Sequence, residues 1–528
     1  MLAAVGIFDR WQRWSLEGVE RPWPRGTSIY EHLRAHTDTT TGKLKDSGTR
    51  LPDEPTDAPN QLRWAAGALD GVMGHHVGAE DEALRVKQLE QAVADVLTTA
   101  TAAGLSHLYQ LVTRDQMLGA IDQVLELVAS NPRLRPERVH ALGIVLAREA
   151  PVREAVKLGL ALLGIVQGGD DEELLLQLGA HDELTLFAAV ALMNRGNNQG
   201  ELALFRLAQR VEGWGRIQVV ERLAETQNPD VQNWMLREGF RNSVMDEYLA
   251  YTCAMTGGLH AALSAPSVDS SLLSGAAGLL TALARGGPAR DLADYPHTEQ
   301  AVAQFLRHVE TGAVDLQVIE ALDALSQRGE VAAPLKKRID ELRGSAAVRQ
   351  LIDVGLASES ETDYWRATQA AQARGIDTFD AYQRRVREGN LDSALFNMMQ
   401  ATTEANIERA LATVTPHLNL AAIATGPEDS PGFGPEFAQH RQLGSVVQCL
   451  SRFPAQGTPL VLAALASPVV NNRHTALRAL AAWPRSSWPS ADVTSALEFA
   501  VQREPLEDLK RRMQRVLDGA TYEEAGDD

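Results

Sequence analysis

Apolar residues recur along most of the chain every three or four positions, the spacing that places them on one face of an α-helix. Runs that alternate apolar and polar residues, as a half-buried β-strand would, are almost absent. In one clear stretch, four apolar residues share a helix face: Leu184, Phe187, Ala188 and Ala191. The polar segment 194–198 interrupts the pattern, and the same spacing returns over 204–211. This pattern predicts an all-α chain in which short turns join neighbouring helices.

A second helix pair follows after Gly213. Its first helix is expected over 217–224, and the triplet 228–230 (Asn-Pro-Asp) predicts the start of the second. Apolar residues cover so much of each helix that one pair cannot bury them alone. Each pair therefore has to pack against the pair before it and the pair after it. This requirement predicts an α-solenoid of antiparallel helix pairs.

The same two-helix unit recurs near the end of the chain. Helices are expected there over 459–466, 470–480, 493–502 and 506–517. Pro468 and Pro505 mark the turns within the two pairs, and a basic residue follows each proline five positions later, as Arg473 and Lys510. This arrangement resembles HEAT and armadillo-like repeats, whose second helix follows an Asp-Pro turn and carries a basic residue at a similar position.

The resemblance covers residues 135–350 and 435–519. The turns depart from the usual aspartate, since Ser467 and Glu504 precede the two prolines, and Asn228-Pro229 lacks the following basic residue. The resemblance implies HEAT-like repeats that form a curved superhelix, with a concave face that binds a partner. It prescribes no catalytic residue.

Further helices are predicted without an evident pairing partner over 268–285, 298–309, 316–325, 347–356, 363–373 and 379–387. Composition then divides the chain into six predicted parts. These are a Trp-rich helical segment (1–36) that caps the array, a polar linker (37–60), a helical repeat array (61–424), a Pro/Gly loop (425–435), C-terminal HEAT-like repeats (436–519) and an acidic tail (520–528).

Composition narrows the class of protein. Of the 528 residues, 45% are hydrophobic and 23% charged, which is typical of a folded chain and excludes disorder throughout. The net charge of −19 repels nucleic acid and anionic lipid, so we expect a protein partner that is neutral or basic. Arginine far outnumbers lysine, which occurs only at positions 43, 45, 87, 157, 336, 337 and 510. That bias is typical of high-GC bacterial coding sequences.

Other features favour a cytoplasmic location. No apolar run approaches the roughly 20 residues that span a bilayer, so we expect no membrane partner. The apolar opening 1–8 lacks the basic residues of a secretion signal. The two cysteines, Cys253 and Cys449, are too few and too far apart for a disulfide framework or a paired-cysteine metal site.

Four histidines near the start of the chain are the best metal-ligand candidates. His32 and His36 stand four residues apart on a predicted helix, a spacing that lets two imidazoles face one metal ion. His75 and His76 follow, but the spacing identifies no further ligand, and Leu33 occupies the position where a zinc protease has glutamate. We interpret the four as surface or packing histidines and keep the metal site as the alternative.

Tryptophans are concentrated in the same region. Trp11 and Trp14, three residues apart on a predicted helix, could anchor this segment in a partner's groove, because tryptophan is a common hot-spot residue. The alternative, which we favour, is that these rings are buried where the N-terminal helix folds back and caps the open end of the solenoid.

Basic clusters raise the third possibility of a HEAT-like nucleic-acid enzyme. They lie at 133–138, 336–338, 384–387 and 510–515. Acidic residues neutralise the last cluster within residues 504–518, so we interpret these clusters as solvated helix faces.

The sequence contains no dinucleotide-binding, P-loop, nucleophile-elbow, zinc-protease or EF-hand motif. It therefore points to no catalytic residue and to no cofactor. The leading hypothesis is a non-catalytic scaffold or adaptor that binds another protein on the concave face of an α-solenoid. The alternatives are a metal-dependent enzyme built on the N-terminal histidines and the nucleic-acid enzyme named above.

Overall fold

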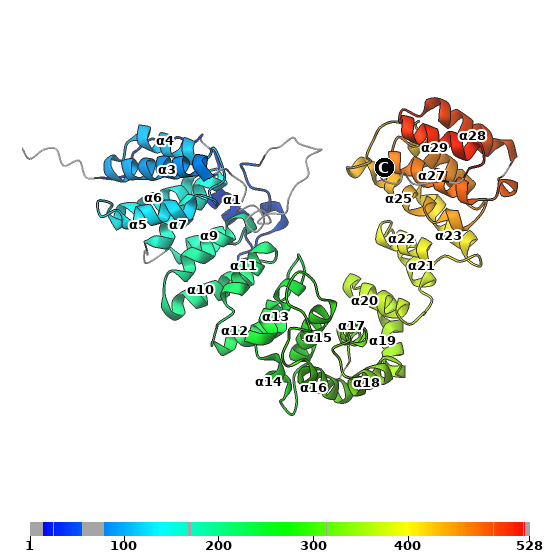
Figure 1. The fold of residues 1–528 in the computed structure, drawn as a ribbon, viewed down its shortest axis with the longest axis horizontal. Coiled ribbons are helices and arrows are strands. Elements are labelled where there is room, and N and C mark those ends of the chain that lie inside the picture. Colours follow the sequence, from blue (N-terminus) through cyan, green and yellow to red (C-terminus); the bar gives the residue numbers. More distant parts are fainter. Residues whose placement is uncertain are drawn as a thin grey trace, which may run out of the picture. The chain divides into compact units, whose positions relative to one another are not determined.

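The computed structural model describes residues 14–24, 26–54, 79–166, 171–312, 314–488, 490–520 and 522, and this part of the chain contains helices and no β-strand (Figure 1). The prediction of an all-α protein is confirmed. The chain divides into two compact units, unit 1 (Met1–Gly344) and unit 2 (Ser345–Asp528), each with a hydrophobic core of its own. The division lies within the repeat array that was predicted over 61–424.

The described part of unit 1 is built from helices, most of them joined by short connections. They are α1 (Ile29–His36), η1 (Asp46–Gly48), α3 (Ala79–Thr99), α4 (Ala102–Val112), α5 (Ile121–Ser130), α6 (Pro136–Glu149), α7 (Arg153–Ile165), α8 (Glu172–Gly179), α9 (Asp182–Met193), α10 (Asn197–Arg210), α11 (Trp214–Arg222), α12 (Pro229–Trp234), η2 (Met235–Gly239), α13 (Glu247–Thr256), α14 (Leu259–Leu263), α15 (Ser270–Arg285), α16 (Thr298–Thr311), α17 (Leu316–Ser326) and α18 (Ala333–Arg343).

The helices predicted in this region are present. The helix expected around 184–191 is α9, and the helix expected after it is α10. The polar segment 194–198 separates them and extends into the first turn of α10. Asn228 caps α12, because its side chain accepts a hydrogen bond from the amide of Asp230. The pattern did not predict that α12 continues into η2, a turn of π-helix over Met235–Gly239.

Alternate helices of unit 1 contact one another in sequence order. One row consists of α7, α9, α11, α13, α15 and α17, in which each helix contacts the next. We call it the inner row, because in Figure 1 its later members line the inner side of unit 1. The other helices, among them α6, α8, α10, α14, α16 and α18, pack against this row from the other side.

Helix α1 packs on two of these other helices, not on the inner row itself. It contacts both α6 and α8, and its Ile29 and Leu33 side chains are fully buried there. The amide of Ile29 donates a hydrogen bond to the carbonyl oxygen of Ala150, at the end of α6. The hydroxyl of Ser28 accepts from the amide of Glu31 and caps the helix. Helix α1 is thus held by side-chain burial and by backbone hydrogen bonds.

Some of the helices approach so closely that only glycine fits between them. A Cβ atom added to Gly159 of α7 would lie 2.7 Å from the backbone nitrogen of Ala147 and 2.9 Å from the carbonyl oxygen of Gly143, both in α6. Those backbone atoms cannot move aside without disturbing α6. Glycine at this position therefore sets the packing distance between α6 and α7.

Unit 2 is also built from helices in its described part. They are α19 (Ala346–Leu356), α20 (Glu361–Gln372), α21 (Phe379–Arg387), α22 (Ser393–Ala401), α23 (Ile407–Val414), η3 (Thr415–His417), α24 (Leu420–Ile423), η4 (Pro435–Phe437), α25 (Ala438–Val447), η5 (Leu450–Arg452), α26 (Thr458–Leu465), α27 (Val470–Ala482), η6 (Arg485–Ser487), α28 (Ser490–Arg503) and α29 (Glu507–Leu517). Consecutive helices α21 and α22, α26 and α27, and α28 and α29 contact each other, and α22, α25, α27 and α29 form a continuous row.

The Pro/Gly segment between α24 and η4 has no α-helix but is held in place by the turn between α26 and α27. The amide of Gly426 donates to the carbonyl oxygen of Ala466, and the amide of Val470 donates to that of Ser430. Ser430 and Val469 form an isolated β-bridge. This segment is thus attached to unit 2 by backbone hydrogen bonds.

Each unit contains one buried cysteine, Cys253 in α13 of unit 1 and Cys449 after α25 of unit 2, and both thiols are free. Burial raises the pKa of both thiols above the usual range. No helix in the described part of the chain has both the length and the apolar character that crossing a bilayer requires.

Candidate functional site

A segment that we call the strap, residues 37–54, lies across the N-terminal ends of three inner-row helices. Asp53 contacts Arg153 at the start of α7, Thr49 contacts His181 at the start of α9, and Lys43 pairs with Glu212 just before α11. The strap falls within the predicted polar linker. In the structure it binds side chains at the starts of helices far away in the sequence.

The far end of the strap is a tight turn. One carboxylate oxygen of Asp38 accepts hydrogen bonds from the amides of Thr40 and Thr41, at 2.9 and 2.8 Å, and these bonds lower the pKa of Asp38. Gly42 has a φ of +71°, and a Cβ atom at this position would lie 2.7 Å from Nε of Arg210. The turn brings Lys43 to the connection between α10 and α11.

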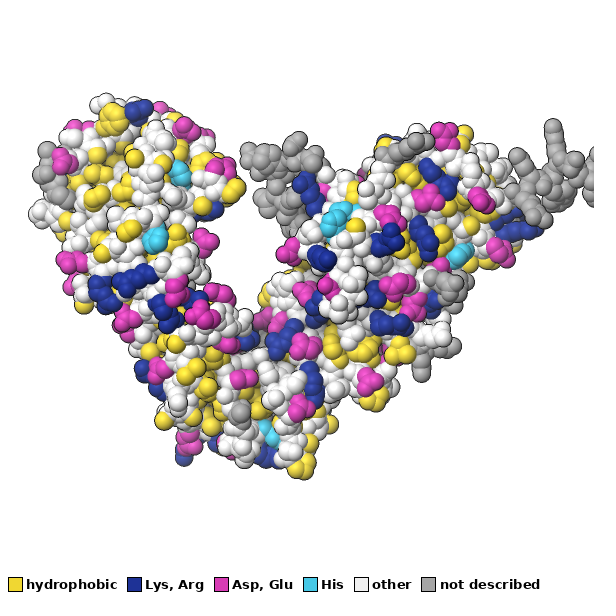
Figure 2. All heavy atoms as spheres, turned by 180° about the vertical axis from the view of Figure 1, so that it is seen from behind, with side chains coloured by type: hydrophobic (Ala, Val, Ile, Leu, Met, Phe, Trp, Pro, Cys, Tyr) yellow, Lys and Arg dark blue, Asp and Glu magenta, His cyan; other side chains and the backbone are white. Residues whose placement is uncertain are grey.

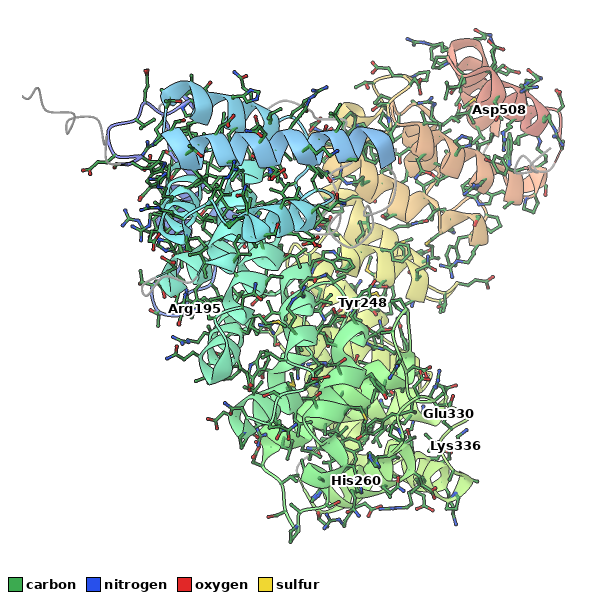
Figure 3. All side chains as sticks on the ribbon, turned by 60° about the vertical axis from the view of Figure 1, so that its left-hand side comes forward. Arg195, Tyr248, His260, Glu330, Lys336 and Asp508 are labelled. Atoms are coloured by element: carbon green, nitrogen blue, oxygen red, sulfur yellow. The ribbon has the colours of Figure 1, made fainter. Side chains whose placement is uncertain are left out.

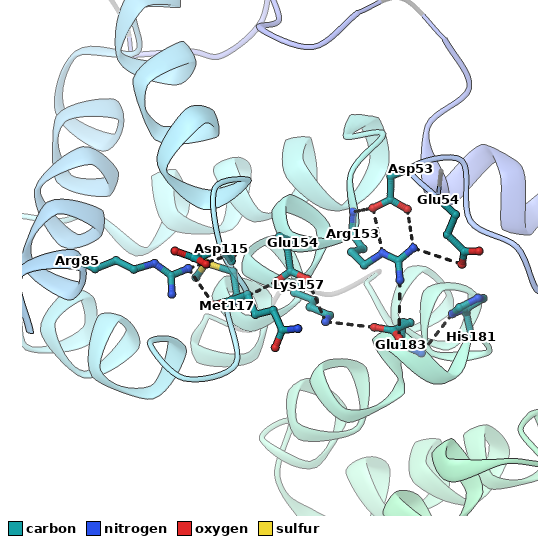
Figure 4. Close-up of polar contacts among 11 residues, drawn as sticks. Asp53, Glu54, Arg85, Asp115, Met117, Arg153, Glu154, Lys157, His181 and Glu183 are labelled. Atoms are coloured by element: carbon teal, nitrogen blue, oxygen red, sulfur yellow. Dashed lines mark hydrogen bonds and ion pairs between the residues drawn. The ribbon is translucent and has the colours of Figure 1, made fainter. Parts of the chain in front are cut away.

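The near end of the strap is held by a network of charged side chains (Figure 4). Arg153 donates to Asp53 from its backbone amide, from Nε and from Nη2, at 2.8, 3.0 and 3.0 Å. Glu54 and Glu183 lie within ion-pair distance of the same guanidinium group. The hydrogen bond and charge of Asp53 raise the pKa of Arg153, outweighing the opposing effect of burial, which is the largest single contribution.

A second cation extends this network into the interior. The buried ammonium group of Lys157 lies 3.2 Å from Glu154 and 3.4 Å from Glu183, and Glu154 also accepts from the amide of Met117 at 2.6 Å (Figure 4). Each charged group thus has an oppositely charged or hydrogen-bonding partner. We interpret the network as a joint between the strap, α7 and α9.

Two buried titratable residues flank this joint. His181 donates from Nε2 to the carbonyl oxygen of Thr49 and accepts at Nδ1 from the amide of Glu183, and burial lowers its pKa. Asp182 accepts from the amide of Gly215 at 3.2 Å, yet burial raises its pKa to about 6. Asp182 links α9 to the first turn of α11.

Beyond the far end of the strap lies a cavity of about 470 Å³, which we call the Arg216 pocket. Its walls come from the strap, the α10–α11 connection, α12 with the π-helical turn, and the turn before α13. The lining residues are Lys43, Gln209, Glu212, Arg216, Trp234, Glu238, Arg241, Asn242 and Ser243. The strap thus covers the ends of α7 and α9 and stops at this pocket.

Arg216 is the buried cation of the pocket, with only 7% of its surface exposed. Its Nε donates to the carbonyl oxygen of Val211 at 2.8 Å, and its Nη1 donates to those of Glu238 and Arg241, at 3.4 and 2.8 Å. Among the described residues, nothing accepts a hydrogen bond from its Nη2. Burial lowers the pKa of Arg216, although a guanidinium group stays charged.

The surroundings of Arg216 are partly aromatic and partly polar. The guanidinium carbon lies 5.7 Å from the ring centre of Trp234, which packs edge-on against Phe205. Trp214, next to the pocket on α11, packs against Tyr248 of α13, which is labelled in Figure 3. Arg241 donates from Nη2 to Gln317 of α17. These contacts hold the pocket walls in position.

The carboxylates of the pocket lie at its rim. Glu212 is paired with Lys43, which lowers the pKa of Glu212, and Glu238 lies 3.8 Å from Nε of Arg241. Both carboxylate side chains are mostly exposed. The interior therefore offers hydrogen-bond donors, a chemistry suited to holding an anionic group.

A second surface hollow, of about 880 Å³, lies between residues 20–31 and the end of α6. Its central cation, Arg21, is fully engaged, because it donates twice to Glu149 and also to the carbonyl oxygens of Leu16 and Val19. This hollow thus offers no comparable buried donor among the described residues, and the Arg216 pocket is the stronger candidate site.

The structure places only part of the predicted histidine group. The rings of His32 and His36 lie 4.4 Å apart on α1; Nδ1 of His36 donates to the carbonyl oxygen of His32, and Nε2 of His32 is buried without a partner in the described part of the chain. His75 and His76 lie outside the described residues. No described group of three or more His, Cys, Asp or Glu residues is placed to hold a metal ion. The four-histidine metal site remains a hypothesis.

Of the two predicted anchor tryptophans, Trp11 lies outside the described residues. Trp14 is partly buried, and its Nε1 donates to the carbonyl oxygen of Val96 at 3.0 Å. The guanidinium group of Arg138 lies over its ring at 5.4 Å. Trp14 thus packs on the ends of α3 and α6.

The basic clusters have partners within the chain. Arg138 donates to the carbonyl oxygen of Leu97, Arg338 pairs with Glu310, and Arg512 pairs with Asp508. Figure 3 places Lys336 and Asp508 at the surface. On the face shown in Figure 2, basic and acidic side chains are interspersed, with no broad area of one sign.

The sequence did not single out the residues of the Arg216 pocket. Lys43 is far from Arg216 and Arg241 in the sequence, and an arginine in the first turn of a helix carries no motif. The only local signal was the Asn-Pro-Asp helix start at 228–230, which predicted α12 but not the π-helical turn after it. Comparisons of this chain with protein-family models, with curated proteins and with solved structures found no match.

Proposed function

We propose that this chain is a cytoplasmic α-solenoid of antiparallel, HEAT-like helix pairs that acts as a non-catalytic scaffold or adaptor for another protein. The observation that carries the proposal is the inner row, in which each of six alternate helices contacts the next member of the row. Serial contact between neighbours is how repeat proteins bury helices that cannot be buried within one pair. Such a row leaves an extended face for a partner.

A buried ion pair in unit 2 supports the repeat interpretation. Arg473, five residues after the first turn proline, donates to Glu504, which directly precedes the second turn proline, at 2.7 and 2.9 Å. Arg473 also donates to the carbonyl oxygens of Ser467 and Pro468. One basic side chain thus joins its own turn to the turn of the next helix pair, as expected for repeating units.

The proposed partner is neutral or basic, because the chain carries a net charge of −19. One feature supports a cytoplasmic, reducing location: both cysteines are buried as free thiols. Apolar side chains also remain exposed on the inner row, including Val190 at 40% and Met255 at 39%. Exposed apolar positions of this kind are available for a protein contact.

The test is capture of a partner by the full-length chain from a cell extract at physiological salt, followed by purified reconstitution. The variant Val190→Glu/Met255→Glu places charge on the inner row. The matched control is Leu202→Glu on α10, where the leucine is 41% exposed. We expect the wild type and the control to bind the same partner and the double variant to lose it. Repeated failure of the wild type to capture any specific protein would overturn the proposal.

A further inference from the structure

The strap provides an internal example of what the ends of the inner-row helices bind. At the start of α7, the carboxylate of Asp53 receives the backbone amide and two guanidinium nitrogens of Arg153. At the start of α11, two helices further along the row, Arg216 occupies a similar place in the first turn. The strap stops there, and no described carboxylate reaches Nη2 of Arg216.

The Arg216 pocket is therefore similar to the site where Asp53 binds Arg153, but it lacks, among the described residues, a carboxylate that accepts from the arginine's Nη2. Arg216 is held rigidly by three backbone carbonyl groups, so its remaining donors have a fixed direction. Arg241 adds a second guanidinium group to the wall, and the hydroxyl of Ser243 donates to no described residue. Buried, preorganised donors of this kind bind an oxyanion more strongly than mobile surface cations do.

We propose that the Arg216 pocket binds an aspartate or glutamate side chain of the partner protein, so that the partner segment continues along the helix ends where the strap stops. This inference rests on the proposed scaffold function and names the chemistry of its partner. A partner that is neutral or basic overall would present a single acidic residue at this point.

The two carboxylates at the rim also act on Arg216, but each of them pairs with another cation. Glu212 is already neutralised by Lys43, and Glu238 is mostly exposed and faces Arg241. The pocket walls thus contain three cations against two carboxylates, and the most buried charge is that of Arg216. The volume of about 470 Å³ accepts a side chain with its backbone, and Trp234 provides an apolar wall for the methylene groups.

The experiment uses the full-length chain and fluorescent pools of seven-residue peptides. The central residue is fixed as Asp, Glu, Asn, Lys or phosphoserine, the other positions are mixed, and binding is measured by fluorescence anisotropy. We expect the Asp and Glu pools to bind about tenfold more tightly than the Asn pool, the effect of one charged hydrogen-bonded contact. Equal binding of the Asp and Asn pools would overturn the proposal, and so would a clear preference for phosphoserine.

Melting temperatures are measured alongside binding, because Arg241 also donates to Gln317 of α17. Ser243→Glu introduces a carboxylate at an exposed position of the pocket, and Arg241→Ala removes the less buried of the two guanidinium groups. The control Gln110→Glu adds the same charge at an exposed position of α4, away from the pocket. We expect the first two variants to lose the tenfold preference and the control to keep it. Ser243→Glu and Gln110→Glu, both at exposed positions, should keep the wild-type melting temperature.

The two proposals can fail separately. If the chain captures a protein partner but Ser243→Glu and Arg241→Ala bind the Asp pool as the wild type does, the pocket assignment is wrong and the scaffold function stands. If the Asp and Glu pools bind through the pocket but no protein partner is captured, the pocket assignment stands and the scaffold function fails.

Discussion

Single buried charges carry much of the specificity of this fold, and Arg473 is the clearest case. Arg473 and its partner Glu504 are both fully buried, with 0% of either side chain exposed. The guanidinium group makes two hydrogen bonds to the carboxylate and two to backbone carbonyl groups. Removing either partner would leave the other charged in a site that water does not reach.

We therefore predict that Arg473→Met lowers the free energy of unfolding of unit 2 by about 3–5 kcal/mol, the usual effect of breaking a buried ion pair. Arg473→Met/Glu504→Leu, which removes both charges, should recover part of the loss. Urea denaturation followed by circular dichroism measures both. As a control, Arg349→Met removes an exposed pair with Asp353 and should cost less than about 1 kcal/mol. A loss in Arg473→Met as small as in this control would contradict the prediction.

Asp182 gives a prediction about pH. Its pKa in the folded protein, about 6, lies above the ordinary value of 3.8, so the folded state binds this proton more tightly than the unfolded state does. Asp182 therefore destabilises the folded state least below about pH 4, where it is protonated. This advantage is lost as the pH rises through about 6. At pH 8 the buried charge costs up to about 3 kcal/mol.

Asp182→Asn should thus raise the melting temperature at pH 8 and change it little at pH 4, because the amide can still accept from Gly215. Thermal unfolding between pH 4 and pH 8 checks this. Asp38→Asn is the control of opposite sign, because the folded state lowers the pKa of Asp38. A constant difference between Asp182→Asn and the wild type at all pH values would rule out the titration of Asp182 as its cause.

At the scale of the element, the strap is the part whose order depends on a few contacts. Its near end is held by Asp53 on Arg153 and its far end by Lys43 on Glu212. Between these points it contributes few buried apolar side chains, chiefly Leu51. Segments with few buried apolar contacts open most readily in the native state.

We predict that Asp53→Asn increases hydrogen–deuterium exchange over residues 43–54 and at the start of α7, by several-fold in rate, and leaves unit 2 unchanged. The asparagine keeps the shape of the side chain but loses the charge that Arg153 binds. Mass spectrometry of exchanged peptides measures the effect. Glu359→Gln, at an exposed site in unit 2, serves as the control. Unchanged protection of the strap in Asp53→Asn would contradict the role given to this contact.

Helices and their ends could be predicted from sequence because the information is local. The stripe through Leu184 and Phe187 and the Asn228 cap both act within one or two turns, and α9 and α12 begin close to where these signals predicted. The strap could not be predicted, because Asp53 and Arg153 are paired across a hundred residues. The Arg216 pocket escaped prediction for the same reason, since its lining residues come from four separate segments.

At the scale of the whole molecule, the buried apolar residues of the described chain form two separate clusters, one in each unit. The hydrophobic pattern alone could not locate the division between them, because helices on both sides of residue 344 carry the same kind of apolar stripe. Two cores with separate packing can lose their structure in separate steps. A substitution such as Arg473→Met is therefore expected to affect unit 2 first.

This division gives the molecule a chemical reporter in each half, because each unit contains one thiol and no more. In native buffer neither Cys253 nor Cys449 should react with a maleimide, since both are buried and protonated. Pulsed labelling along a urea gradient, with the modified cysteine identified by mass spectrometry, should give two midpoints. Arg473→Met should lower the urea midpoint for labelling of Cys449 alone. The two natural cysteines thus report the unfolding of the two units without any introduced probe.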